Sequence, residues 1–206
     1  MSRVLSKPLI LASQSPRRAE LLQQIGIPFT ATPAEIDETP VAGESPEDFV
    51  RRMAVSKAQM IHAQHPQDIV LGSDTAVVLH GRILGKPDNR EHAIEMLLSL
   101  SGREHRVLTG VAVVHAETEY AVSDNRVLFR DITLEEAERY WESGEPSDKA
   151  GGYAIQGHGA VFIERIEGSY SGIMGLPLFE TAQLLARAGV TVWSDSHQTA
   201  NTNHFR

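Results

Sequence analysis

The stretch Leu9-Ile10-Leu11-Ala12-Ser13-Gln14-Ser15-Pro16-Arg17-Arg18 predicts a short buried strand, a tight polar turn and the first turn of a helix. Ser15 is a favourable N-cap residue, and proline suits the first helical position because its missing N–H would have no partner there. A helix N-terminus favours anions, and two arginines in the first turn oppose the helix dipole. We therefore interpret the arginines as partners of a bound phosphate. On this segment alone, a solvated arginine pair on an amphipathic helix is an equally good interpretation.

Length, cysteine content and charge limit what the chain can do. Its 206 residues suffice for one α/β domain or for two small lobes around a cleft. The chain has no cysteine, which excludes disulfides, thiolate metal ligands and cysteine nucleophiles. The formal net charge of −8 argues against binding to duplex nucleic acid, because such proteins must neutralise backbone phosphates. A small phosphorylated ligand held by local lysines and arginines is compatible with this charge.

Targeting features are missing from the sequence. Met1–Lys7 lacks the long apolar segment of a secretory signal, and no apolar run approaches membrane-spanning length. We therefore expect a cytoplasmic protein that does not contact a membrane. Residues 1–193 are expected to form a single domain, and the polar residues 194–206 a disordered tail.

Apolar spacing and turn residues predict alternating helices and strands. Helices are predicted over residues 16–25, 46–65, 90–100, 134–143 and 175–189. Strands are predicted over residues 9–11, 28–32, 69–71, 76–79, 82–84, 106–114, 121–129 and 160–163. His80-Gly81 is expected to close a hairpin, and the two longest strands are expected to form an antiparallel pair.

Lys57 and Asp74 interrupt apolar patterns. Lys57 follows Met53 by four residues, so it falls on the apolar face of the helix predicted over residues 46–65. Either it reaches out to solvent or its ammonium points into a cleft. Asp74 lies between two apolar strand segments, where an unpaired buried carboxylate is costly. It therefore needs a cation, a lysine or water as its partner.

Two loops carry further candidates. Glu35–Pro40 contains several carboxylates, which is typical of a solvated loop and, alternatively, of a site for a hard cation such as Mg²⁺ or Mn²⁺. The glycine-rich segment Asp148–Gly159 permits close backbone approach, and its Gln156 can read the edge of a base. Its glycine spacing is not that of a dinucleotide fingerprint or a P-loop. His105 and His115 lack metal-ligand spacing and are interpreted as structural or surface residues.

Ordered motifs between about residues 8 and 190 resemble those of the Maf family of nucleoside triphosphate pyrophosphatases. They are Ala12-Ser13-Gln14-Ser15-Pro16-Arg17-Arg18, Asp37-Glu38, Lys57-Ala58, Gly72-Ser73-Asp74-Thr75, Gly85-Lys86-Pro87, Ser101-Gly102, His105, Thr109-Gly110-Val111, Asp148-Lys149-Ala150-Gly151-Gly152-Tyr153 and Gly175-Leu176-Pro177. A single motif would be weak evidence, but the ordered set is strong.

The resemblance implies an α/β fold with a long mixed central sheet flanked by helices, and two lobes around a central cleft, as in Maf and ITPase-like proteins. It implies a homodimer that hydrolyses a nucleoside triphosphate between its α- and β-phosphorus atoms, giving the monophosphate and pyrophosphate. The implied cofactor is a divalent cation, Mg²⁺ or Mn²⁺. Within the family, Thr75 and the segment Tyr153–Gly157 resemble the branch that hydrolyses dTTP and UTP.

Residue chemistry and the resemblance together suggest catalytic roles. Asp74 is the expected general base, and Glu38 and Asp74 are the expected metal ligands. The expected phosphate-binding residues are Ser13, Arg17, Lys57 and Lys86. Arg18 is a weaker candidate, because one of two adjacent side chains usually faces away.

The resemblance implies that Arg17, Thr75 and Gln156 are important for substrate choice. Thr75 and Gln156 can supply polar contacts that reject a base with the wrong edge. Asn125 departs from the family pattern, which has a threonine near the end of this strand. Its amide can still form hydrogen bonds, but any role in orienting a neighbour is in doubt.

Two rival functions are compatible with the same residues. A phosphomonoesterase acting on nucleotides would release orthophosphate instead of pyrophosphate. A nucleotide-binding regulator of cell division or septum formation would bind without significant turnover. The carboxylates Glu38 and Asp74 favour hydrolysis, because a pure binder gains little from acids beside a polyanion.

Overall fold

The computed structural model describes residues 8–192, so Met1–Lys7 and the tail predicted over residues 194–206 lie outside the described residues. The described strands form one mixed seven-stranded sheet in the order β2-β1-β3-β5-β6-β7, with β4 paired to β3. Their bounds are β1 Leu9–Leu11, β2 Thr30–Ala31, β3 Ile69–Leu79, β4 Arg82–Leu84, β5 Glu104–Val114, β6 Thr118–Phe129 and β7 Ile163–Glu167. The long mixed sheet expected from the sequence is confirmed.

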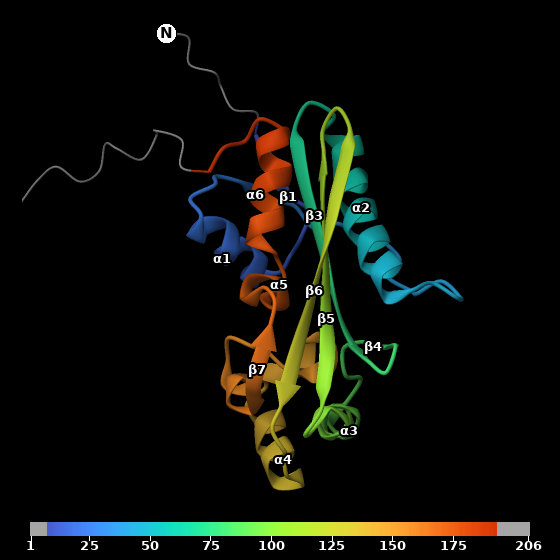
Figure 1. The fold of residues 1–206 in the computed structure, drawn as a ribbon. Helices are drawn as coiled ribbons and strands as arrows, with labels where there is room; N and C mark the ends of the chain where they lie inside the picture. Colours follow the sequence, from blue (N-terminus) through green and yellow to red (C-terminus); the bar gives the residue numbers. More distant parts are fainter. Residues whose placement is uncertain (1–7, 193–206) are drawn as a thin grey trace, which may run out of the picture.

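The antiparallel strands β3, β5 and β6 run the length of the molecule (Figure 1). The sequence predicted an interruption of β3 at residues 72–75, and this prediction is wrong. The strand is continuous because β5 pairs with it from Val70 to Val78. The predicted strand over residues 160–163 is also wrong: His158–Phe162 forms a 3₁₀ turn, and the strand that follows pairs with β6.

The helices lie close to where capping residues and apolar spacing predicted them. Their bounds are α1 Pro16–Gln24, α2 Pro46–Gln64, α3 Arg90–Leu100, α4 Leu134–Glu142, α5 Tyr170–Met174 and α6 Leu178–Arg187. Ser45, Asn89 and Thr133 each accept a backbone N–H at the start of a helix. The side chain of Ser15 does not cap α1; its backbone N–H donates instead to Ser13 Oγ at 3.1 Å. The short helix α5 was not predicted.

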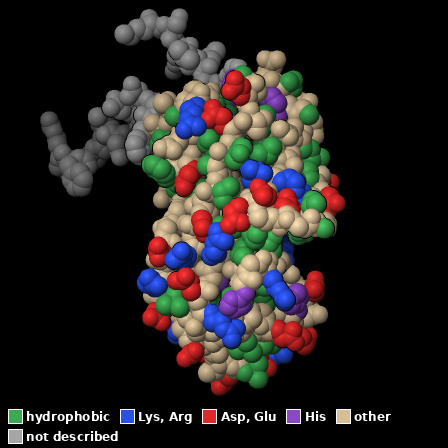
Figure 2. Space-filling model, turned by 45° about the vertical axis from the view of Figure 1, so that its right-hand side comes forward, with side chains coloured by type: hydrophobic (Ala, Val, Ile, Leu, Met, Phe, Trp, Pro, Cys, Tyr) green, Lys and Arg blue, Asp and Glu red, His purple; other side chains and the backbone are tan. Residues whose placement is uncertain are grey.

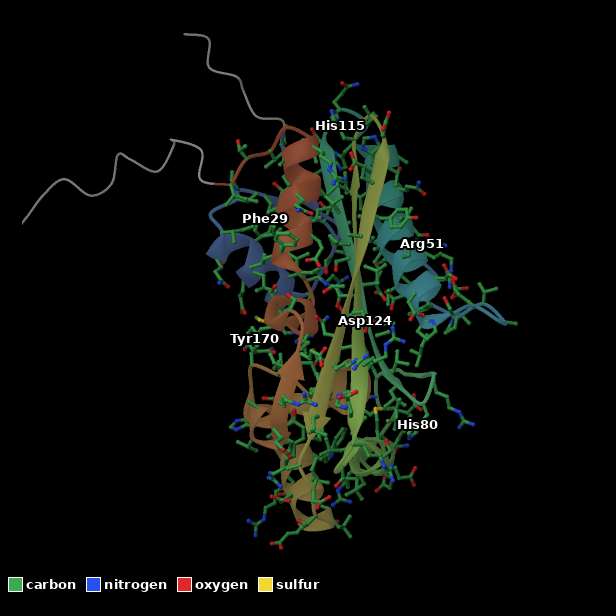
Figure 3. The ribbon with its side chains drawn as sticks, in the orientation of Figure 1. Phe29, Arg51, His80, His115, Asp124 and Tyr170 are labelled. Atoms are coloured by element: carbon green, nitrogen blue, oxygen red, sulfur yellow. The ribbon has the colours of Figure 1, made fainter. Side chains whose placement is uncertain are left out.

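Helices cover both faces of the sheet (Figure 1). In one half of the molecule, α1 and α6 pack on one face and α2 on the other, while α3 and α4 lie at the opposite end. Separate apolar clusters fill these two ends, one around Leu22, Leu71 and Leu185 and one around Phe129 and Leu97. In Figure 3, His115 marks the hairpin tip between β5 and β6, and Asp124 marks the middle of β6.

Two glycines allow α2 to lie directly on the sheet. A Cβ at Gly72 would lie 2.3 Å from the carbonyl oxygen of Ala54, and a Cβ at Gly110 would lie 2.3 Å from that of Val50. Any side chain at either position would push the helix away from the sheet. This close approach determines how far the side chains of α2 reach across β3.

The edge of β3 is open over a short distance. Strand β1 pairs with residues 69–71 of β3, and β4 pairs with residues 77–79. No described strand pairs with residues 72–76 on this side. Among the described helices, none is long and apolar enough to span a bilayer.

Candidate functional site

A cleft with a volume of about 740 Å³ lies beside the open edge of β3. It is lined by the β1–α1 turn, the loop before α2, the middle of β3, the β4–α3 loop and the segment after Tyr153. Every site residue predicted from the sequence contributes to this lining: Ser13, Arg17, Glu38, Lys57, Asp74, Thr75, Lys86 and Gln156. The sequence-based candidates therefore meet in one place, although they are spread over most of the chain.

Lys57 holds two carboxylates together. Its Nζ lies 2.7 Å from Asp74 Oδ1 and 2.6 Å from Glu38 Oε1. Lys57 and Asp74 are only 7% and 8% exposed, so water solvates neither charge well. The two opposite charges therefore stabilise each other. The partner that Asp74 was predicted to need is thus a lysine. Both of these Lys57 contacts are to carboxylates.

Glu38 forms the outer part of this cluster, since 54% of its side chain is exposed. Partial burial raises the pKa of Glu38, but the hydrogen bond and charge of Lys57 outweigh that effect. The net result is a pKa below the usual value for a glutamate. The Glu38 carboxylate therefore stays ionised at neutral pH and can bind a cation.

Arg18 joins three segments of the site. Its Nε donates to the carbonyl oxygen of Gly175 at 2.9 Å, its Nη1 to Ser13 Oγ at 3.1 Å and its Nη2 to Thr75 Oγ1 at 3.4 Å. Desolvation lowers the pKa of Arg18, and attraction to Asp74 offsets part of that shift. Sequence reasoning ranked Arg18 below Arg17, because an arginine pair gives no sign of which member turns inward.

The hydroxyl of Thr75 has a fixed polarity. Thr109 Oγ1 donates to the carbonyl oxygen of Gly172 at 2.8 Å, which uses its only proton. In the 2.9 Å contact between the two threonine hydroxyls, Thr75 must therefore be the donor. Thr75 Oγ1 then acts only as an acceptor, toward Arg18 or toward a ligand donor in the cleft.

Asn125 anchors the α5 segment, which carries the carbonyl groups of Gly172 and Gly175 that bind Thr109 and Arg18. It is 1% exposed, its Nδ2 donates to the carbonyl oxygen of Val107 at 3.0 Å, and its Oδ1 accepts the Ser169 N–H at 2.6 Å. The amide thus links β5 to the start of α5. The prediction that Asn125 can still form hydrogen bonds is confirmed.

A second wall of the cleft contains a buried aromatic cluster. His105 Nε2 lies 2.8 Å from the hydroxyl oxygen of Tyr153, and both rings contact Phe129 edge-on. Burial lowers the pKa of His105 to about 4 and raises the pKa of Tyr153 above its usual value. His105 is therefore a neutral structural residue, as the sequence predicted. Gln156, three residues beyond Tyr153, is exposed at the cleft.

The donor set near Lys57 suits a cation that is shared with a phosphorylated ligand. Within residues 8–192, no group of three or more His, Asp or Glu side chains is arranged to hold a metal ion alone. Lys57 Nζ binds Glu38 Oε1 and Asp74 Oδ1, so the second oxygen of each carboxylate is the one that could bind a cation. Mg²⁺ commonly uses one or two protein carboxylates and takes its other ligands from phosphates and water. The two carboxylates fit that pattern.

The molecular surface outside the cleft carries both signs of charge. On the face shown in Figure 2, acidic and basic side chains lie interspersed. A phosphorylated ligand would therefore be attracted by the local set of Arg17, Lys86 and Lys149 at the cleft, rather than by the overall field of an acidic protein.

Comparison with known proteins gives consistent matches over most of the chain. A family model described as "Maf-like protein" matches residues 8–188. A dTTP/UTP pyrophosphatase of Methylococcus capsulatus is 53% identical over 184 residues, covering 88% of this chain and 91% of that protein. One of Alkalilimnicola ehrlichii is 54% identical over 183 residues, covering 86% and 91%. One of Syntrophus aciditrophicus is 46% identical over 203 residues, covering 97% and 99%.

Proposed function

Because this chain belongs to the Maf family, we propose that it hydrolyses dTTP and UTP between the α- and β-phosphorus atoms, giving the monophosphate and pyrophosphate. One observation carries the proposal: a buried carboxylate, Asp74, is paired with Lys57 on the floor of a cleft whose rim is basic. Such a cleft can hold a polyanion and also supply a base. The relatives named above are dTTP/UTP pyrophosphatases, which supports the same reaction.

Asp74 is the general base in this mechanism. Its Oδ1 is held by Lys57 at 2.7 Å, which orients the carboxylate and leaves Oδ2 to take a proton from the attacking water. Helix α2 packs closely on the sheet at Gly72, and this packing holds Lys57 within hydrogen-bonding distance of Asp74. Hydrolysis then proceeds by attack of the activated water on phosphorus and departure of pyrophosphate.

The phosphates bind along the opposite wall. The Ser13 hydroxyl, the Arg17 guanidinium and the Lys86 ammonium can surround the triphosphate at the N-terminal end of α1. These groups stabilise the charge that develops on the leaving pyrophosphate. Arg18 also lines the cleft and holds this wall together by donating to Gly175, Ser13 and Thr75.

Glu38 and Asp74 would hold the divalent cation, Mg²⁺ or Mn²⁺. When bound, the cation supplies charge neutralisation at the phosphate oxygens. Lys57 then retains the Asp74 carboxylate in position beside the phosphates. The exposed side chain of Glu38 leaves its carboxylate accessible to a cation from the open side of the cleft.

Base selection follows from the polarity of Thr75. Uracil and thymine carry an N3–H donor, whereas cytosine presents an acceptor at N3. The acceptor-only Thr75 oxygen favours the donor edge. Gln156, which also lines the cleft and has one donor and one acceptor group, can pair with the neighbouring carbonyl of the base.

Three broader properties are also proposed, from the family resemblance and from the missing targeting features of the sequence. They are a cytoplasmic location, assembly as a homodimer, and a single two-lobed catalytic domain over residues 1–193. The proposed partners are the nucleoside triphosphate and the cation, without duplex nucleic acid or membrane.

A turnover assay tests the function. The protein is mixed with dTTP, UTP, CTP or GTP and with Mg²⁺ or Mn²⁺, and products are resolved by ³¹P NMR. We expect pyrophosphate and monophosphate from dTTP and UTP, and a loss of kcat of about 10²–10⁴-fold in Asp74→Asn. Asp124→Asn, at an exposed position of β6 outside the cleft lining (Figure 3), is the matched control and should keep its activity.

The same assay separates the rival functions. Orthophosphate as the first product would indicate a phosphomonoesterase. Saturable binding without product, in a fully folded preparation, would indicate a nucleotide-binding regulator of cell division.

A further inference from the structure

Gln156 lies on a short segment that has no strand or helix of its own to hold it. Residues 154–157 follow the buried Tyr153 and lead into the 3₁₀ turn His158–Phe162. The side chain of Gln156 is exposed at the cleft. An exposed glutamine on an unsupported loop would sample many orientations, and ordering it on a ligand would cost binding free energy.

Hydrogen bonds from outside the cleft fix this segment at both ends. At its start, the Ala154 N–H donates to the hydroxyl oxygen of Tyr140 at 3.1 Å. At its end, the His158 N–H donates to Glu145 Oε2 at 2.9 Å, and the Gly159 N–H donates to Glu145 Oε1 at 3.1 Å. These hydrogen bonds therefore hold the backbone on both sides of Gln156.

Tyr140 and Glu145 are joined to each other. The Tyr140 hydroxyl donates to Glu145 Oε1 at 2.6 Å, so the two anchors form one unit. Tyr140 is 5% exposed, and its ring packs edge-on against Phe162 with centroids 5.2 Å apart. The unit therefore has a rigid base in the apolar core at this end of the sheet.

The segment passes directly over the Glu145 carboxylate. A Cβ at Gly157 would lie 2.0 Å from Glu145 Oε2, so a larger residue beside Gln156 would displace this carboxylate from its donors. Desolvation raises the pKa of Glu145, but the donors Tyr140, Gly159 and His158 outweigh it and hold the pKa below its usual value. The carboxylate is therefore ionised and acts as an acceptor for all three donors.

We propose that Tyr140 and Glu145 are positioning residues that hold Gln156 for base recognition, so that substrate selectivity is set partly from outside the cleft. Neither residue lines the cleft, and both Glu145 oxygens already accept donors from this chain. They thus act through Gln156 and not on the substrate. This inference rests on the proposed hydrolysis of dTTP and UTP.

The test measures selectivity in a double-mutant cycle. Tyr140→Phe, Glu145→Gln and Gln156→Ala are made singly, and Tyr140→Phe and Glu145→Gln are each combined with Gln156→Ala. The readout is the ratio of kcat/KM for UTP to kcat/KM for CTP. We expect each single variant to lower this ratio by about tenfold, and we expect no further decrease when either anchor variant is added to Gln156→Ala.

The control is Glu142→Gln, on the exposed C-terminal turn of α4. It should leave the ratio unchanged. Thermal unfolding midpoints are measured in parallel, because a merely structural role would lower the midpoint without changing the ratio. If Tyr140→Phe does not fold, Glu145→Gln alone completes the cycle.

The outcomes separate this inference from the proposed function. If the unmodified protein hydrolyses neither UTP nor CTP, the proposed function is wrong and the positioning role falls with it. If UTP is hydrolysed but the ratio is near one, is unaffected by the anchor variants, or decreases additively with Gln156→Ala, only the positioning role is overturned.

Discussion

Lys57 Nζ lies 2.7 Å from Asp74 Oδ1, and the two side chains are among the few charged groups buried in the described part of the chain. Lys57 comes from the apolar face of α2, and Asp74 comes from the centre of the pairing between β3 and β5. Removing one partner leaves the other charge buried without compensation, which is far more costly than losing a surface ion pair.

Lys57→Met is therefore expected to lower the free energy of unfolding by about 3–5 kcal/mol. Urea denaturation at pH 7 measures this change. Lys86→Met, which removes an exposed lysine from the same cleft, is the control and should change stability by less than about 0.5 kcal/mol. The double variant Lys57→Met with Asp74→Asn should regain part of the lost stability without regaining activity. A loss below about 1 kcal/mol in Lys57→Met would contradict the buried-pair interpretation.

The adjacent arginines are expected to behave differently. Arg18→Met removes three hydrogen bonds that tie α1 to Gly175, Ser13 and Thr75, so it should cost about 2 kcal/mol or more of stability. Arg17→Met should leave stability nearly unchanged and raise KM for UTP roughly tenfold or more, because it removes a charge-assisted phosphate contact. Denaturation and steady-state kinetics on both variants test this division. Equal stability losses in the two variants would refute it.

Thr109 is expected to control substrate choice through the polarity of Thr75. In Thr109→Val the hydroxyl that receives the Thr75 proton is gone, so Thr75 can turn and donate into the cleft. The preference for UTP over CTP should fall by about tenfold. Thr109→Ser keeps the hydroxyl and should keep the preference, which makes it the matched control. The relevant measurement is kcat/KM for both nucleotides.

His105 is expected to make stability dependent on pH. Its folded pKa of about 4 lies below the unfolded value of about 6.5, because burial disfavours the charged ring. As the pH falls below about 6.5, the unfolded chain gains a proton that the folded chain does not. The unfolding free energy should therefore decrease by about 1.4 kcal/mol per pH unit. The total loss of unfolding free energy should reach about 3 kcal/mol near pH 4.

Denaturation curves between pH 7 and pH 5 measure this slope. His105→Gln should flatten it relative to the unmodified protein. His80→Asn, at the exposed turn between β3 and β4 (Figure 3), should leave it unchanged. An identical slope in the protein with and without His105 would show that other groups cause the pH dependence.

Much of the site could be predicted because its residues break local patterns. Lys57 on an apolar helix face and Asp74 inside an apolar run are both costly unless they meet, and the structure brings them together. The start of α2 was predictable as well, since Ser45 caps it and Pro46 suits its first turn. Such features depend only on neighbouring residues, so they can be recognised in a single sequence.

The errors concern features that depend on distant contacts. Residues 72–75 resembled a polar break in β3, but the Ser73 hydroxyl binds the carbonyl oxygens of Gly110 and Gly175, and Asp74 binds Lys57. Tertiary partners thus allow the strand to continue through polar residues. Likewise, the inward turn of Arg18 depends on a carbonyl group 157 residues away in the sequence. The anchoring of Gln156 by Tyr140 and Glu145 has no local signal at all.

The short open edge of β3 also affects self-association. An unpaired strand edge is a template to which a strand of another molecule can add. Here the opening covers only residues 72–76, with β1 at one end and β4 at the other. The opening is thus about as long as a single strand of ordinary length, about 5–6 residues, and any longer foreign strand would collide with β1 or β4. Because the gap is closed at both ends, it offers an added strand much less room than a free edge of the same sheet would.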